Sequence, residues 1–249
     1  MRISEQGVLI LTLFFAISTR GAWPQMLSPA MPAVLTSAQI VDEMQRHNLA
    51  RTEALKSLKS IRHYQAEYQG FSKDIVAKMD VEYDYDAKLG KRFQIVTMSG
   101  SKIICDKVLK RAVDSEMEAS HDIGSTALTP ANYKFHLAGI DNLGGRPAYV
   151  LDVEPLAASK FLYRGKIWVD AADFALVMID VEPAKNPSFW ISRTRIRQTF
   201  TKTSGFWLPE LNRSESKVRI GGTAAFTIDY GRYQVVPSAP LVANALRGY

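Results

Sequence analysis

Residues 160–170 read Lys-Phe-Leu-Tyr-Arg-Gly-Lys-Ile-Trp-Val-Asp and open a stretch, ending at Tyr233, in which apolar runs alternate with turn residues. The segments between the runs are short and rich in Gly, Asn, Asp and Pro, such as Ser204-Gly205. Runs joined in this way are typical of an antiparallel meander and not of alternating strands and helices. The five strands expected in this stretch are residues 161–170, 174–182, 190–200, 206–220 and 223–230.

Further strands are expected upstream, at residues 62–70, 74–86, 92–98, 102–105, 133–137 and 147–153. The clearest is 74–86, where apolar and acidic side chains alternate and Val76 is the exception. This alternation indicates one buried and one wet face. The acidic row could be interpreted as a metal site, but side chains two apart on a strand lie roughly 7 Å apart and do not close around an ion. We therefore expect no metal.

Two helices are expected beside the sheet. Thr36 and Gln39 have the spacing of a capping box, and the first helix is expected to carry its apolar stripe as far as Leu58. Asp106 is placed to cap a second helix, residues 107–120, in mid-chain. The pattern predicts a mainly β fold with helices (α+β), a curled or unclosed antiparallel β-barrel of roughly ten strands with a helical lid.

The N-terminus has the pattern of a secretory signal peptide. Met1-Arg2 is a short basic region, and residues 8–17 form an apolar core too short to span a bilayer. Small residues near Ser18, or at Ala22, suit cleavage, and an uncleaved anchor helix is the alternative. A cleaved signal predicts a periplasmic protein. The expected divisions are a signal peptide at 1–22, a flexible leader at 23–35, a single domain at 36–236 and a loose tail at 237–249.

The 249-residue chain has a net charge of +6 and a pI near 9.3. For an exported protein this favours an acidic membrane surface or an acidic protein as partner over nucleic acid. Cys105 is the single cysteine, which excludes an intramolecular disulfide. We expect it to be a small buried hydrophobe in an apolar strand. A catalytic thiol is the alternative, with His121 or His136 brought near by the fold.

One face of the predicted sheet is apolar and carries many large side chains, and two helices are few to cover it. A curled sheet under a partial lid makes a concave apolar pocket. The alternative is that these side chains simply fill a packed interior. The candidate cavity-lining residues are Tyr64, Tyr68, Met79, Val81, Tyr83, Tyr85, Phe135, Leu137, Tyr149, Leu151, Phe161, Tyr163, Met178, Trp190 and Phe226.

Four segments follow the early helix in order: Tyr64-Gln-Ala-Glu-Tyr68, Gly145-Arg-Pro-Ala-Tyr-Val-Leu-Asp-Val153, Gly165-Lys-Ile-Trp-Val-Asp170 and Phe206-Trp-Leu-Pro209. With them the chain resembles, over residues 37–235, the outer-membrane lipoprotein-sorting family, which is similar to the carrier LolA and its relatives LolB and RseB. The resemblance implies an unclosed barrel, a helical lid and a cavity for acyl chains, without catalysis or a cofactor. Carriers of this family use an inward arginine near the cavity mouth, for which Arg62 and Arg92 are the candidates by order.

The resemblance implies a monomeric, non-catalytic periplasmic carrier that takes lipoprotein acyl chains or other lipids to the outer membrane. Its partners would be donor and acceptor proteins at the inner and outer membranes. An RseB-like lipid-sensing module is one alternative, and a hydrolase is another, although the chain has no Gly-x-Ser-x-Gly and no His-Glu-x-x-His motif.

A row of arginines on one strand face is a further candidate for partner binding. Arg193, Arg195 and Arg197 alternate with other residues, so they share one face. They are expected either to meet lipid phosphates or an acidic partner, or to pair across strands with acids such as Asp180 or Glu215.

Overall fold

The computed structural model describes residues 35–70, 74–121, 123–186, 189–219 and 221–238, which belong to one compact unit. The predicted signal peptide, almost all of the predicted leader and most of the predicted tail lie outside the described residues. Among the described residues, none of the helices combines the length and the apolar character needed to cross a membrane.

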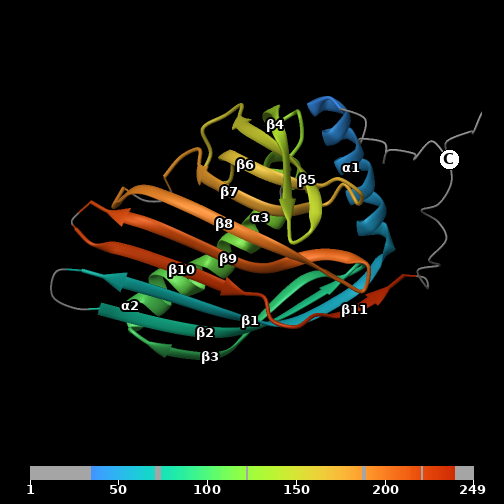
Figure 1. Ribbon diagram of the computed structural model, residues 1–249. Coiled ribbons are helices and arrows are strands. Elements are labelled where there is room, and N and C mark those ends of the chain that lie inside the picture. The colour runs from blue at the N-terminus through green and yellow to red at the C-terminus, as the bar shows by residue number, and fades with distance from the viewer. Residues whose placement is uncertain (1–34, 71–73, 122, 187–188, 220, 239–249) are drawn as a thin grey trace, which may run out of the picture. The chain divides into compact units, whose positions relative to one another are not determined.

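Helices and strands follow one another in the order shown in Figure 1. The helices are α1 (Ser37–Ala54), α2 (Lys102–Ile104), the π-helical turn η1 (Cys105–Leu109), α3 (Lys110–His121) and α4 (Ile123–Thr126). The strands are β1 (Leu55–Gln69), β2 (Asp74–Asp86), β3 (Gly90–Gly100), β4 (Tyr133–Leu143), β5 (Arg146–Pro155), β6 (Tyr163–Asp170), β7 (Leu176–Pro183), β8 (Ile191–Thr203), β9 (Phe206–Val218), β10 (Thr223–Asp229) and β11 (Gln234–Pro237).

All of these strands belong to one antiparallel sheet. Its order is β3-β2-β1-β10-β9-β8-β7-β6-β5-β4, and β11 pairs with the first part of β1 beside this path. Strands β3 and β4 end the order, and no pairing among the described strands joins them, so the sheet is curled but not closed. The predicted fold class and the predicted meander from β6 to β10 are confirmed.

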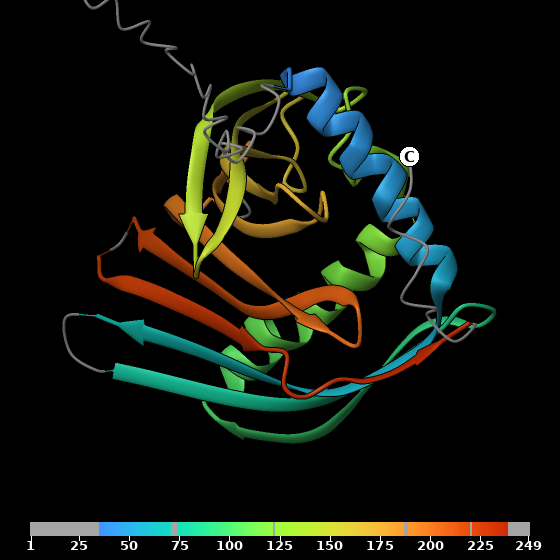
Figure 2. The ribbon, with the colours of Figure 1, turned by 45° about the vertical axis from the view of Figure 1, so that its right-hand side comes forward.

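The helical segment of residues 102–126 connects one edge strand of the sheet to the other. It leaves β3, passes over β2 and β1 through η1, and continues through α3 and α4 towards β4. Figure 2 shows this segment on the side of the sheet towards which the strands curl, with α1 running beside the sheet. Helix α1 contacts β4 and β1. We call the sheet face that packs against these helices the inner face, and the opposite one the outer face.

Three local predictions are wrong. Asp106 does not cap a helix that begins at residue 107, because it lies inside the π-helical turn η1, where its carboxylate accepts a hydrogen bond from Lys110 Nζ. Helix α1 ends at Ala54, not near Leu58, because strand β1 already begins at Leu55 and buries every second side chain from Leu58 onward. The predicted strand at 102–105 is helical instead, and the amide of Cys105 donates to the carbonyl of Ser101. The chain must leave the sheet there to cross the inner face, and this tertiary demand overrides the strand preference of an apolar run.

The predicted capping box of α1 is confirmed. The amide of Gln39 donates to Thr36 Oγ1 over 3.3 Å, and the amide of Thr36 donates to Gln39 Oε1 over 2.9 Å. Two amides that have no partner inside the helix are satisfied in this way.

We expect Thr36→Ala to lower the free energy of unfolding by about 1 kcal/mol, because it removes the cap of α1. Thr52→Ala is the matched control, since the Thr52 hydroxyl donates only to the Asn48 carbonyl of the same helix. Urea unfolding of both variants measures the difference. Equal losses in the two variants would contradict a role for the cap.

Candidate functional site

Two apolar clusters cover the inner face at its two ends. The first, which we call the α1 cluster, joins α1 to strands β4 to β7; its buried members are Ile40, Val41, Met44, Tyr133, Tyr149, Leu151, Val153, Leu162, Ile167, Val169 and Val181. The second, the α3 cluster, joins η1 and α3 to β1, β2 and β10; its buried members are Tyr64, Ala66, Ala77, Met79, Val81, Cys105, Leu109, Val113, Ile228 and Tyr230. Cys105 is therefore buried, as predicted.

Between the two clusters, the first part of β8 and the second part of β9 carry polar side chains on the inner face. Thr194 and Ser216 pair through their hydroxyls over 2.8 Å, and Asn212 Nδ2 donates to Gln198 Oε1 over 2.9 Å. Thr194 lies two residues before Ile196 on β8 and therefore faces the same side of the sheet. Ile196 packs on the α1 cluster. These side chains hydrogen-bond to one another, which reduces the cost of placing them beside apolar groups. The inner face thus has polar side chains between its two apolar clusters, and a third cluster of Leu58, Tyr83, Phe206 and Leu208 joins β1 and β2 to the start of β9.

Arg62 is the most unusual group on the inner face. It is only 4% exposed, and its Nη1 donates to both carboxylate oxygens of Glu116 on α3, over 2.9 and 2.8 Å. Its guanidinium carbon lies 3.6 Å from the ring centroid of Tyr83 and 4.9 Å from that of Tyr230. Burial alone would lower the pKa of Arg62, but the nearby Glu116 carboxylate outweighs burial and raises it. The charged pair thus ties α3 to β1 beneath the helices.

Three buried polar atoms on β1, one of them on Arg62 itself, lack a hydrogen-bond partner among the described residues. Ser60 Oγ, Arg62 Nε and Tyr64 OH are buried and have no hydrogen-bond partner in the part of the chain that the structure describes. They occur at every second residue of β1, so they line up on the inner face. A buried polar atom without a partner is costly, so this row is a ready site for water or for the polar group of a ligand.

Arg62 and Arg92, the two predicted mouth arginines, lie in different surroundings. Arg62 is buried in the pair with Glu116, whereas the side chain of Arg92 is 64% exposed and lies 3.8 Å from Asp84. Only Arg62 is on the inner face beneath a helix. Its partner Glu116 could not be predicted from the sequence, because a carboxylate on a predicted helix gives no local sign of which strand it will reach.

The predicted cavity-lining residues separate into three groups. Residues in the packed core of the inner face are Tyr64, Met79, Val81, Tyr83, Tyr149 and Leu151. Partly buried residues are Tyr68, Tyr85, Phe135, Leu137, Phe161, Tyr163 and Phe226. Met178 pairs with Trp168 and packs beside it on the outer face, and Trp190 is 56% exposed at the start of β8. In this structure the inner-face members are covered by helices.

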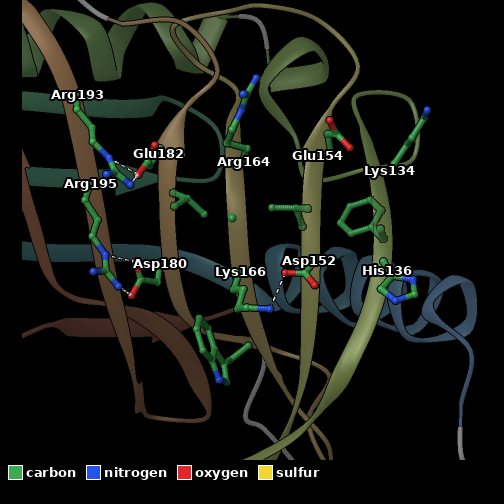
Figure 3. A pocket seen from close by; sticks show the side chains of 15 residues that line it. Lys134, His136, Asp152, Glu154, Arg164, Lys166, Asp180, Glu182, Arg193 and Arg195 are labelled. Carbon is green, nitrogen blue, oxygen red and sulfur yellow. Dashed lines mark hydrogen bonds and ion pairs between the residues drawn. The ribbon is translucent and has the colours of Figure 1, made fainter.

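A hollow of about 980 Å³ lies on the outer face across β4 to β8 (Figure 3). Its charged side chains form ion pairs across the strands: Arg195 with Asp180, Arg193 with Glu182, and Lys166 with Asp152. The hydrogen bonds from Arg195 are the main cause of the lowered pKa of Asp180.

Two arginines of the β8 row, Arg193 and Arg195, line this hollow and pair there with acids. The predicted pairing of the row with Asp180 is confirmed for Arg195 and Arg197. Within the described residues, no group of three or more His, Cys, Asp or Glu is placed to hold a metal ion.

No family model and no curated protein sequence matches the chain. Solved structures with a similar fold include an outer membrane lipoprotein-sorting protein domain from Vibrio parahaemolyticus (10% identity, TM-score 0.38), which covers 83% of this chain and 97% of that one. A LolA superfamily protein from Nitrosomonas europaea (11% identity, TM-score 0.37) covers 81% and 94%. The MucA/MucB complex of Pseudomonas aeruginosa (12% identity, TM-score 0.28) covers 79% and 94%.

We expect Glu116→Gln to lower the free energy of unfolding by about 3 kcal/mol, because it leaves the buried Arg62 without its counter-charge. The matched control is Glu118→Gln on the same helix, where the carboxylate is 59% exposed and pairs with Lys160 at the surface. Such exposed pairs contribute less than about 1 kcal/mol. Urea unfolding at neutral pH measures both variants. If Glu118→Gln lowered the free energy of unfolding as much as Glu116→Gln does, the larger contribution expected of the buried pair would be contradicted.

Alkaline pH should destabilise the protein through its buried tyrosines. Burial raises the pKa of Tyr83 to about 12, whereas tyrosines in the unfolded chain ionise near pH 10. Between these values the unfolded chain binds fewer protons than the native state, so stability falls as pH rises. We expect the free energy of unfolding of Tyr83→Phe to fall less steeply than that of wild type between about pH 10 and 12, measured by urea unfolding at each pH. Identical slopes would contradict this.

Proposed function

We propose that the protein is an exported, non-catalytic carrier that holds lipid acyl chains, such as those of lipoproteins, against the inner face of its sheet. The observation that carries the proposal is the unclosed sheet, whose apolar inner face is covered by helices. The resemblance of the sequence to lipoprotein-sorting carriers supports the same conclusion. We assign it no cofactor and place it in the periplasm as a monomer that exchanges cargo with membrane donor and acceptor proteins.

In this proposal, the segment of residues 102–126 acts as a lid. It is held to the inner face by side-chain packing in the α3 cluster and by the pair between Arg62 and Glu116. Moving it away therefore leaves the strand pairings of the sheet intact. The helices must move for cargo to enter, because Met79, Val81 and Leu109 are fully buried beneath or within the lid.

The free energy of acyl-chain burial is large enough to offset lid opening. Each CH₂ group moved from water into an apolar site gains about 0.8 kcal/mol, so a chain with about fifteen CH₂ groups gains about 12 kcal/mol. Separating Arg62 from Glu116 costs about 3 kcal/mol, the lower end of the range for breaking a buried ion pair, in addition to the lost packing. Once the lid is displaced, Ser60, Arg62 and Tyr64 would offer polar partners to the carbonyl groups of the lipid.

Native mass spectrometry of protein purified from a periplasm without detergent tests the proposal. We expect co-purifying lipid or lipopeptide masses, and uptake of a fluorescent fatty acid by the delipidated protein. Phe226→Asp should abolish both, because Phe226 packs on the α3 cluster of the inner face. Met178→Asp is the matched control, since Met178 lies on the outer face and should bind as wild type does.

Circular dichroism must first show that both variants are folded. Glu116→Gln should take up the fatty acid at least tenfold faster than wild type, since 1.4 kcal/mol corresponds to a factor of ten in a rate. Glu118→Gln should not. A protein that purifies without lipid and takes up no fatty acid, even as Glu116→Gln, would overturn the proposal and leave the inner face as a packed interior.

A further inference from the structure

Two large aromatic side chains project from one end of the sheet. Phe189 is 76% exposed and Trp190 is 56% exposed, and their rings form an edge-to-face pair with centroids 5.5 Å apart. They immediately precede β8, which runs beside β9. Figure 1 shows the start of β8 and the end of β9 together, away from α1. Neither ring belongs to the apolar clusters of the inner face.

Basic residues surround the aromatic pair. The guanidinium carbon of Arg219 lies 5.4 Å from the Phe189 ring centroid, and the amide of Arg219 donates to the Trp190 carbonyl over 2.8 Å. Lys217 is directly opposite Arg193 in the strand pairing, which places two like charges side by side. We call Lys185, Phe189, Trp190, Arg193, Lys217 and Arg219 the aromatic tip.

The charge of the aromatic tip is not balanced by its own acids. Glu182 pairs with Arg193. Lys185, Lys217 and Arg219 are exposed, and among the described residues they form no ion pair. Like charges opposite one another on a sheet are destabilising. Exposed apolar rings are unfavourable in water, and such exposed patches mark interaction sites. The tip thus combines two features that a complementary surface would stabilise together.

We propose that the aromatic tip docks on the surface of a bilayer that contains anionic phospholipids. Phe and Trp rings prefer the interface between headgroups and acyl chains, and Lys and Arg near an anionic leaflet are attracted to its phosphates. The two rings stand at the end of a strand, where they can enter a soft headgroup layer without a matching pocket. The net charge of +6 favours approach of the whole molecule to such a surface. This inference does not rest on the cargo proposed above.

Vesicle binding by the delipidated full chain tests the proposal. We expect co-sedimentation with vesicles of phosphatidylcholine that contain about one third phosphatidylglycerol, weakened at high salt because the attraction is screened. Lipids brominated on their acyl chains should quench Trp190, so quenching should be lost in Trp190→Phe. Wild-type protein that stays unbound to anionic vesicles at low salt overturns the proposal and leaves an acidic protein surface as the partner of the tip.

Paired variants separate the tip from general charge and hydrophobicity. Lys217→Gln with Arg219→Gln should weaken vesicle binding at least tenfold, since each charge near the membrane contributes about fivefold. Phe189→Ser with Trp190→Ser should also weaken vesicle binding, because it removes the rings that enter the headgroup layer.

The matched controls lie in the turn between β2 and β3, where Leu89 is 71% exposed. Leu89→Ser, and separately Lys88→Gln with Lys91→Gln, should bind as wild type does. Losses in these controls equal to those in the tip variants would overturn the assignment to the tip. Native mass spectra of the tip variants should keep any co-purifying lipid, which distinguishes failure of docking from failure of cargo binding.

Discussion

The sheet has two unpaired edges that are joined by a single helical segment, and most of the structure follows from this constraint. Strand β3 ends at one edge and β4 begins at the other, so the residues between them must cross the inner face. That crossing places Glu116 where it meets Arg62 and covers the apolar side chains of β1 and β2. Because helices contact a sheet through side chains and strands contact one another through backbone hydrogen bonds, the cover is the part that can move.

The two faces of the sheet differ in the side chains they carry and in how those side chains are satisfied. On the inner face, apolar clusters at either end are separated by polar side chains on β8 and β9 that hydrogen-bond to one another. On the outer face, Arg195 and Arg197 share the carboxylate of Asp180 and Arg193 pairs with Glu182, whereas Lys185, Lys217 and Arg219 form no ion pair among the described residues. The proposed cargo binding and the proposed membrane docking thus involve separate surfaces. A variant can therefore lose one of these activities and keep the other.

Patterns that depend only on neighbouring residues were sufficient for much of the fold. The alternation at 74–86 predicted β2 with the bounds that the structure has, and the turn residues after Tyr163 predicted the order of the meander. The capping box of Thr36 was predicted on the same local grounds, whereas Cys105 is buried as predicted but in a helical turn and not in the predicted strand. These features could be read directly because a strand or a helix end imposes its periodicity or its hydrogen bonds within a few residues.

The sequence by itself determined the antiparallel sheet and the order of the meander from β6 to β10, and the tertiary structure decided that β1 pairs with β10 and which side chains face the lid. Residues 176–179 are apolar without alternation, so the irregular pairing beside Trp168 that turns Met178 to the outer face could not be read from them. The pair between Arg62 and Glu116 joins residues that are 54 positions apart. Such contacts depend on where the chain crosses the sheet, which is a property of the packed molecule and not of any local pattern.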